Sequence, residues 1–183
     1  MDLPEKLEEA LLLLNTKLYQ KGLTFDITVL GSMALHFTGF KISRRTDIDI
    51  YNKDIDEKIE QLITEVADEL NLEFDWINNR ASSIEPLPEN YQARVKTITN
   101  FSNINLNIID LEDLIKLKVN AIYSRDEIKD IEDLKSLFPT SSQLDEAIDY
   151  LKNQIIFHHG ENEFLLRKKE LEEFRKELDD KIR

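Results

Sequence analysis

Two aspartates, Asp47 and Asp49, are the residues whose type and spacing point most directly to chemistry. They belong to the run Asp47-Ile48-Asp49-Ile50, which has the composition of a strand, and strand residues two apart share a face. We therefore expect both carboxylates to project together while the two isoleucines point into a core. Neighbouring carboxylates repel each other unless a cation lies between them. Mg²⁺ held by one or two carboxylates together with substrate phosphates is a common solution, and a solvated surface strand is the alternative.

A Gly-Ser pair precedes these acids, at a point where a strand is expected to lead into a helix. Phe25 to Leu30 is apolar and β-branched enough for a buried strand, and residues 33–37 are typical of a helix start. Gly31 allows a ligand to approach the backbone closely, whereas Ser32 can cap the helix and offer its hydroxyl. Free N–H groups in such a turn suit an anion such as phosphate. The pair and the two acids together indicate a site for a phosphate-bearing ligand more strongly than either motif does alone.

Three cations, Lys41, Arg44 and Arg45, lie just upstream of the acids. In one interpretation they form a solvated loop that balances the two carboxylates. In the other, Arg44 or Arg45 contacts a triphosphate, because a guanidinium pairs with phosphate as well as with carboxylate. The sequence leaves both interpretations open.

The elements that must position these residues follow from the spacing of apolar side chains. Helices are predicted over 4–21, ended by Gly22, and over 54–70. Residues 93–101 and 104–109 alternate as two strands, joined in a hairpin at Ser102-Asn103. This order predicts a mixed α/β (α+β) fold with four main strands and flanking helices. Between them, Trp76 is interpreted as a partly buried packing residue and Asp75 as the cap of a short turn.

The last part of the sequence is predicted to be helical. Helices are expected over 111–124, over 143–157 and over 163–183, with breaks at Pro139 and Gly160. We expect one domain over 1–138 and a helical extension over 139–183. The final helix is highly charged with a narrow apolar seam, so it packs on its own domain or pairs with a protein partner or a second copy.

Composition restricts the class of protein. The chain has 183 residues, 41% of them hydrophobic, which is enough for a sizeable core. Without cysteine it has no disulfide or thiolate metal site, and its three histidines are scattered. It shows no apolar run of membrane-spanning length and no signal peptide, so a cytoplasmic location is expected. The net charge of −13 argues against extensive charge-driven binding of a nucleic-acid backbone, although a local basic patch remains compatible with it.

The Gly-Ser turn, short helix and Asp-x-Asp strand between Leu30 and Ile50 resemble the signature of the DNA polymerase beta-like nucleotidyltransferase superfamily. The resemblance implies that Gly31 and Ser32 hold a nucleoside triphosphate and that Asp47 and Asp49 bind Mg²⁺. Many members carry a third carboxylate on a later strand. Residues 94–97 of this chain occupy that region without an acid.

A second block is similar to the abortive-infection type nucleotidyltransferases, which include the toxin enzymes of bicistronic toxin-antitoxin systems. It consists of a helix reading L-x-x-x-K-x-x-A, then Arg125, then Lys-Asp-Ile-Glu-Asp-Leu at 129–134. The run Phe-Asp-Trp-Ile-Asn at 74–78 also looks like one branch of this group. The resemblance implies catalytic or nucleotide-binding roles for Lys118 and Asp130. In the alternative, structural interpretation, Lys118 buries its aliphatic chain and exposes its ammonium group to solvent, and Asp130 is an acid in the first turn of a helix.

The function expected from these residues is Mg²⁺-dependent transfer of a nucleotide from a nucleoside triphosphate to a hydroxyl. By resemblance, the acceptor is RNA, at a transfer-RNA 3′ end, or a protein side chain, and the chain is a toxin-antitoxin component. Asp75 or Asp130 could replace the third carboxylate. The alternative is a catalytically inactive protein of the same fold that acts as an interaction or antitoxin-like partner.

Overall fold

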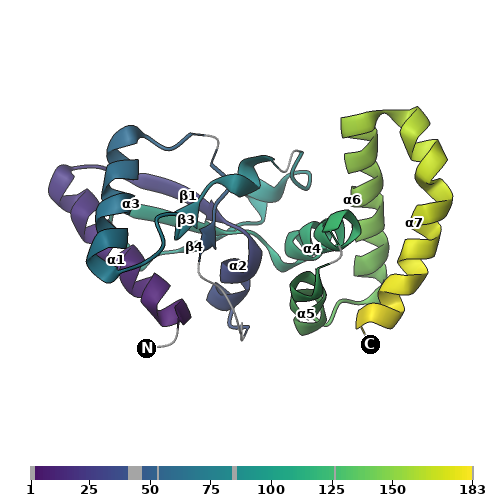
Figure 1. Cartoon of the computed structure of the whole chain (residues 1–183), viewed down its shortest axis with the longest axis horizontal. Coiled ribbons are helices and arrows are strands. Elements are labelled where there is room, and N and C mark those ends of the chain that lie inside the picture. Colours follow the sequence, from purple (N-terminus) through teal and green to yellow (C-terminus); the bar gives the residue numbers. More distant parts are fainter. Residues whose placement is uncertain (1–2, 41–46, 53, 84–85, 126, 183) are drawn as a thin grey trace. The chain divides into compact units, whose positions relative to one another are not determined.

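The structure is a computed structural model, and it describes residues 3–40, 47–52, 54–83, 86–125 and 127–182 (Figure 1). The chain divides into two compact units. The first, here the sheet unit, comprises Met1–Ile84 and Gln92–Ile109. The second, here the helical unit, comprises Glu85–Tyr91 and Asp110–Arg183. The domain boundary expected after residue 138 falls inside the helical unit.

The sheet unit is built on a mixed arrangement of short strands. β1 pairs in parallel with β5, and β5 pairs antiparallel with β4, so the predicted hairpin is confirmed. On its other side β1 reaches β2 through an antiparallel bridge between Val29 and Ile50, and β2 pairs in parallel with β3. The predicted strand over 47–51 is therefore shorter than expected, and β3 is a strand that the sequence pattern did not indicate. The strands are β1 (Phe25–Val29), β2 (Ile48–Asp49), β3 (Ile77–Asn78), β4 (Lys96–Ile98) and β5 (Ile104–Ile108).

Alternation of side chains gives β1, β2 and β5 one buried apolar face and one more exposed polar face. In β1, Phe25, Ile27 and Val29 are buried while Asp26 between them is exposed. Ile48 and Ile50 are fully buried. Because Val29 and Ile50 are bridged and both buried, the aspartates that alternate with the isoleucines lie on the opposite, polar face.

The predicted helices of the sheet unit are confirmed, and they cover the apolar face. α1 (Leu3–Lys21) and α3 (Glu57–Leu70) lie side by side against the strands (Figure 1). The apolar stripe of α1 is fully buried, and Asp56 caps α3 by accepting a hydrogen bond from the N–H of Lys58 at 2.9 Å. α2 (Gly31–Phe37) directly follows β1. Two 3-10 helices, Arg80–Ser83 and Tyr91–Ala93, lie in the connections.

The helical unit consists of α4 to α7. Thr140 and Gln143 form a capping box at the start of α6, which explains the break expected at Pro139. Leu171, Phe174 and Leu178 of α7 are buried in the core of this unit, so the final helix packs on its own unit. Within the described residues, none of the helices is long and apolar enough to cross a membrane. The helices are α4 (Leu111–Arg125), α5 (Ile128–Ser136), α6 (Ser141–His159) and α7 (Glu161–Ile182).

Candidate active site

The turn after β1 and the end of β2 lie side by side in the sheet unit. The N–H of Leu30 donates a hydrogen bond to the carbonyl of Asp49 at 2.9 Å. Gly31 has φ +63°, and a Cβ on it would lie 3.0 Å from Oδ2 of Asp49. The Asp49 carboxylate therefore lies against the turn, in space that only a glycine leaves open.

Asp47 is held on the same polar face by Asn78, the last residue of β3, and by Arg80, which follows that strand. Oδ2 of Asp47 accepts hydrogen bonds from Nδ2 of Asn78 at 3.2 Å and from Nη2 of Arg80 at 3.4 Å. Asn78 is also the register partner of Asp49 in the pairing of β2 with β3. The side chains of Asp47, Asp49 and Asn78 thus share one face, since neighbouring residues of paired strands point the same way.

Arg80 links this group to a further carboxylate. Its Nε and its backbone N–H both donate to Oδ1 of Asn78, at 3.0 and 3.1 Å, and its Nη2 donates to Oδ2 of Asp75 at 2.8 Å. Two donors at Oδ1 fix the orientation of the Asn78 amide, so that its Nδ2 is directed at Asp47. Asp75, for which a capping role was expected, forms an ion pair with Arg80.

Three further residues were predicted to belong to this site, namely Ser32, Arg44 and Arg45. Ser32 lies in the first turn of α2 and is 2% exposed. The N-cap of α2 is Leu30, which makes no side-chain capping bond, so the expectation that Ser32 caps this helix is wrong. Arg44 and Arg45 lie outside the described residues.

The donor set around Asp47 and Asp49 suits a hard divalent cation with an incomplete protein shell. Carboxylate oxygens are ligands that Mg²⁺ favours, and this ion usually keeps several waters and binds substrate phosphates as well. Over the part of the chain that the structure describes, no group of three or more His, Cys, Asp or Glu side chains could hold a metal ion. Two carboxylates beside a turn are therefore better suited to Mg²⁺ that a phosphate ligand also coordinates than to a metal ion coordinated by protein side chains alone.

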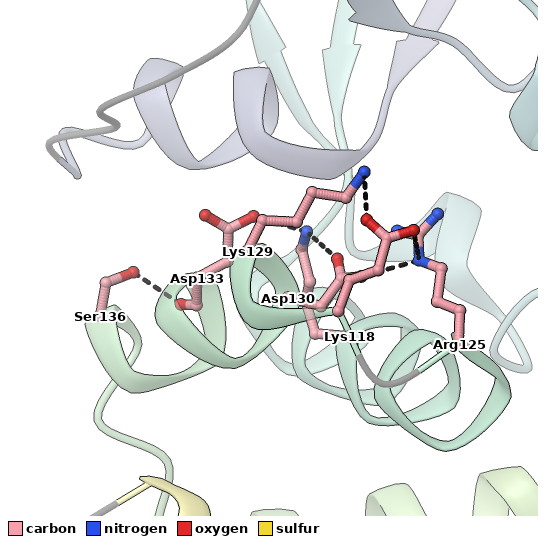
Figure 2. A network of polar contacts seen from close by, with 7 residues as sticks. Lys118, Arg125, Lys129, Asp130, Asp133 and Ser136 are labelled. Atoms are coloured by element: carbon pink, nitrogen blue, oxygen red, sulfur yellow. Dashed lines mark hydrogen bonds and ion pairs between the residues drawn. The ribbon is translucent and has the colours of Figure 1, made fainter.

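Lys118 and Asp130 meet in the helical unit, where they form a charged cluster between α4 and α5 (Figure 2). Nζ of Lys118 donates to Oδ1 of Asp130 at 3.0 Å and to Oδ2 of Asp133 at 2.6 Å. Nε of Arg125 donates to the second oxygen of Asp130 at 2.7 Å. The Lys118 side chain is 7% exposed, so its tip lies among carboxylates rather than in solvent.

The charges of this cluster balance, and they set the ionisation of Asp130. Burial raises the pKa of the Asp130 carboxyl, but hydrogen bonds and positive charge from Arg125 and Lys118 outweigh it and hold that pKa below its ordinary value. Asp130 is therefore an ionised carboxylate at neutral pH. The cluster joins the two helices regardless of any further role of its members.

Asn78 and Arg80 are residues of this site to which the sequence assigned no role. A strand of two residues has no measurable alternation, so the pattern could not place them beside the aspartates. The available signal was the polar run Asn78-Asn79-Arg80 directly after the apolar Trp76 and Ile77. Such a run at the end of a strand is where binding side chains often gather.

Comparison with protein-family models gave a match over residues 5–175 to the family described as "Nucleotidyltransferase of unknown function (DUF6036)". Comparisons with curated proteins and with solved structures each gave no match. The family match covers both the sheet unit and most of the helical unit.

Proposed function

The chain belongs to this family of nucleotidyltransferases, and from that premise we propose that it transfers a nucleotide from a nucleoside triphosphate to a hydroxyl group, with release of pyrophosphate. In this reaction an acceptor oxygen forms a bond to the α-phosphorus while the bond to the bridging oxygen of pyrophosphate breaks. The acceptor hydroxyl loses its proton in the same step.

One observation carries the proposal: the carboxylate of Asp49 lies against Gly31, with Asp47 on the same face of the strands. The missing side chain at Gly31 lets the Asp49 carboxylate lie against the turn, and two carboxylates on one face attract a divalent cation that phosphates also bind. Phosphoryl and nucleotidyl transfer need positioning and charge neutralisation more than covalent chemistry by the protein, and this arrangement can supply both.

The roles proposed for individual residues follow from this geometry and from the family. Asp47 and Asp49 would hold Mg²⁺, which when bound neutralises charge on the triphosphate. Gly31 and Ser32 would accommodate its phosphates, and Arg44 or Arg45 would contact its outer oxygens.

Lys118 and Asp130 are proposed to take part through the motif resemblance. Lys118 would balance negative charge that develops on the triphosphate, and Asp130 would orient the acceptor or take its proton. Lys118 and Arg125 hold the pKa of the Asp130 carboxyl below its ordinary value, so Asp130 is the carboxylate that its proposed role requires.

The acceptor is proposed to be RNA at a transfer-RNA 3′ end or a protein hydroxyl, as in the abortive-infection type toxins. The support is the block that contains Lys118, Arg125 and Asp130, which is similar to that group. The net charge of −13 makes a long RNA contact unfavourable, so a short RNA terminus or a protein side chain suits this chain better.

The test combines binding with label transfer. Calorimetry with each nucleoside triphosphate and Mg²⁺ is compared between the wild type, Asp47→Asn/Asp49→Asn and the control Asp54→Asn/Asp68→Asn, which removes two exposed aspartates of the same unit. Total RNA and cell lysate are then incubated with triphosphates labelled at the α- or the γ-phosphate. We expect label from the α-position alone to reach a macromolecule, and only with the wild type and the control.

A second candidate function is that of a nucleotide-binding protein without turnover. It is favoured by the absence, within the described residues, of a third acid that could share a metal ion with Asp47 and Asp49. Triphosphate binding that requires Mg²⁺ and both aspartates, with no label transfer to any acceptor, would select this candidate. Triphosphate binding without metal and without loss in the double variant would contradict both.

A further inference from the structure

We propose that Arg80 is a ligand of the substrate's phosphates, and that it exchanges Asp47 for a phosphate when a divalent cation and a phosphate chain enter the site. This inference rests on the proposed function, because it assigns a partner to the same two aspartates. It concerns a residue that neither the sequence motifs nor the family description assigns.

The distances around the guanidinium of Arg80 distinguish two short hydrogen bonds, to Asp75 and Asn78, from a longer one to Asp47. Arg80 is held at 2.8 Å by Asp75 and at 3.0 Å by Asn78, whereas its contact with Asp47 measures 3.4 Å. A charge-assisted hydrogen bond of this type is ordinarily 2.7 to 2.9 Å long, so the contact with Asp47 is the weak one. Arg80 can therefore leave Asp47 while its bonds to Asp75 and Asn78 persist.

A cation at Asp47 changes the balance of charge that keeps Arg80 there. The guanidinium of Arg80 offsets the negative charge of Asp47. If Asp47 held a divalent cation, that positive charge would offset the carboxylate instead, and the guanidinium of Arg80 would pair with phosphate oxygens of the substrate. Guanidinium groups bind phosphate oxygens in the same forked geometry in which they bind carboxylates.

The side chain of Arg80 is exposed to solvent, whereas the backbone segment that precedes it is held by buried contacts. Its side chain is 64% exposed, so an incoming phosphate can reach it. The segment before it is fixed by Trp76, which is fully buried and donates its indole N–H to the carbonyl of Ile63 in α3 at 3.0 Å. The carbonyl of Trp76 also accepts the N–H of Ile48, which precedes Asp49. The segment that precedes Arg80 and the strand that carries the aspartates therefore pack together. Arg80 is thus held in position before a ligand binds, and pre-organised groups bind at lower entropic cost.

The experiment measures phosphate binding and cation binding separately in the full-length chain. Inorganic tripolyphosphate with Mg²⁺ is titrated by calorimetry, and Mn²⁺ alone is titrated by electron paramagnetic resonance. We expect Arg80→Gln to weaken tripolyphosphate binding about tenfold, the loss typical of one charge-assisted hydrogen bond. We expect Mn²⁺ alone to bind Arg80→Gln at least as tightly as the wild type, because a positive charge beside Asp47 has been removed.

Further variants separate phosphate binding from a purely structural role. Arg80→Lys retains the charge without the fork, so its tripolyphosphate affinity should lie between those of the wild type and Arg80→Gln. Asp75→Asn weakens the anchor and should lower tripolyphosphate affinity by a smaller factor. Arg167→Gln, which removes the same charge from α7, should bind tripolyphosphate like the wild type. Thermal unfolding of each variant without ligand defines the temperature range for the titrations.

Three outcomes would overturn the inference. If Arg80→Gln binds tripolyphosphate like the wild type while Asp47→Asn/Asp49→Asn does not, Arg80 is no phosphate ligand and the proposed function stands. If Arg80→Gln weakens Mn²⁺ and tripolyphosphate binding equally, Arg80 only maintains the shape of the site. If the wild type binds neither probe, the inference and the proposed function fail together.

Discussion

Two independent features favour glycine at position 31: a left-handed backbone conformation and the close approach of the Asp49 carboxylate. Its φ of +63° lies in the left-handed region, and a Cβ would meet the Asp49 carboxylate at 3.0 Å. Gly22 has nearly the same φ, +65°, but nothing lies within 4 Å of the position of its missing Cβ. The two glycines therefore separate the cost of the backbone conformation from the cost of displacing Asp49.

We expect Gly31→Ala to destabilise the fold more than Gly22→Ala does. Each substitution pays about 1–2 kcal/mol for alanine in the left-handed region. Gly31→Ala must also move the Asp49 carboxylate, so it should weaken Mn²⁺ binding, whereas Gly22→Ala should leave Mn²⁺ binding unchanged. Urea unfolding gives the stabilities, and electron paramagnetic resonance gives the affinity for Mn²⁺. Equal effects of the two substitutions in both measurements would contradict this account.

The sequence indicated part of this site and missed part of it for a physical reason. Alternation along residues 47–50 correctly predicted that Ile48 and Ile50 are buried, because the period of a strand is a local property. The contact of Asp47 with Asn78 joins residues 31 positions apart, through strands of two residues each. No local pattern encodes such a pairing, so Asn78 and Arg80 emerged only from the structure.

At the scale of elements, the cluster around Asp130 connects α4 with α5. Lys118 and Arg125 come from α4, and Asp130 and Asp133 come from α5 (Figure 2). Asp130 is fully buried. Removal of one member of a buried ion pair leaves the others without compensation, which costs more than the intact pair contributes.

We expect Asp130→Asn to cost about 3 kcal/mol at pH 7, the loss typical of a broken buried pair. The pKa of Asp130 is held below the ordinary value of 3.8, so the folded state favours the ionised carboxylate. Its contribution is complete above that ordinary value and is lost as the pH falls through the folded-state pKa. The difference in unfolding free energy between wild type and variant should therefore be constant from pH 7 to about pH 5 and shrink below about pH 4.

Urea unfolding at several pH values between 7 and 3 measures this difference. Lys129→Met provides a control, because Lys129 forms a pair with Glu127 in which both side chains are about half exposed. Solvent screens pairs of that kind, so only a small effect on the free energy of unfolding is expected. A difference for Asp130→Asn that stays constant down to pH 3 would show that its carboxylate is not the source of the stabilisation.

Helices were easier to predict than strand pairing, because apolar periodicity and caps are read from neighbouring residues. The helices expected over 4–21, 111–124 and 143–157 appear within a few residues of their predicted ends. The expected strands also appear, yet the parallel pairing of β1 with β5 and of β2 with β3 depends on contacts between distant segments. Four main strands were predicted, and the structure adds the short β3 beside β2.

At the scale of the whole molecule, the chain alternates between its two units. Residues 85–91 belong to the helical unit although the segments on both sides belong to the sheet unit. Within the helical unit, the carbonyl of Pro86 accepts hydrogen bonds from Tyr150 and Gln154 of α6. Sequence composition did not indicate that residues 85–91 belong to the helical unit, because a boundary set by long-range contacts need not coincide with a proline or glycine break.

The extent of the helical unit can be tested with two fragments. Its core combines Ile115, Val119 and Ile122 of α4 and Leu134 of α5 with apolar residues of α6 and α7. We therefore expect the fragment 110–183 to unfold cooperatively, and to be less stable than the same unit in the full chain because it lacks residues 85–91. The fragment 139–183 should be only marginally helical, since two helices without α4 and α5 expose the apolar side of α6. Circular dichroism during thermal unfolding distinguishes the two. Cooperative unfolding of 139–183 would instead favour a separate C-terminal extension that begins after residue 138.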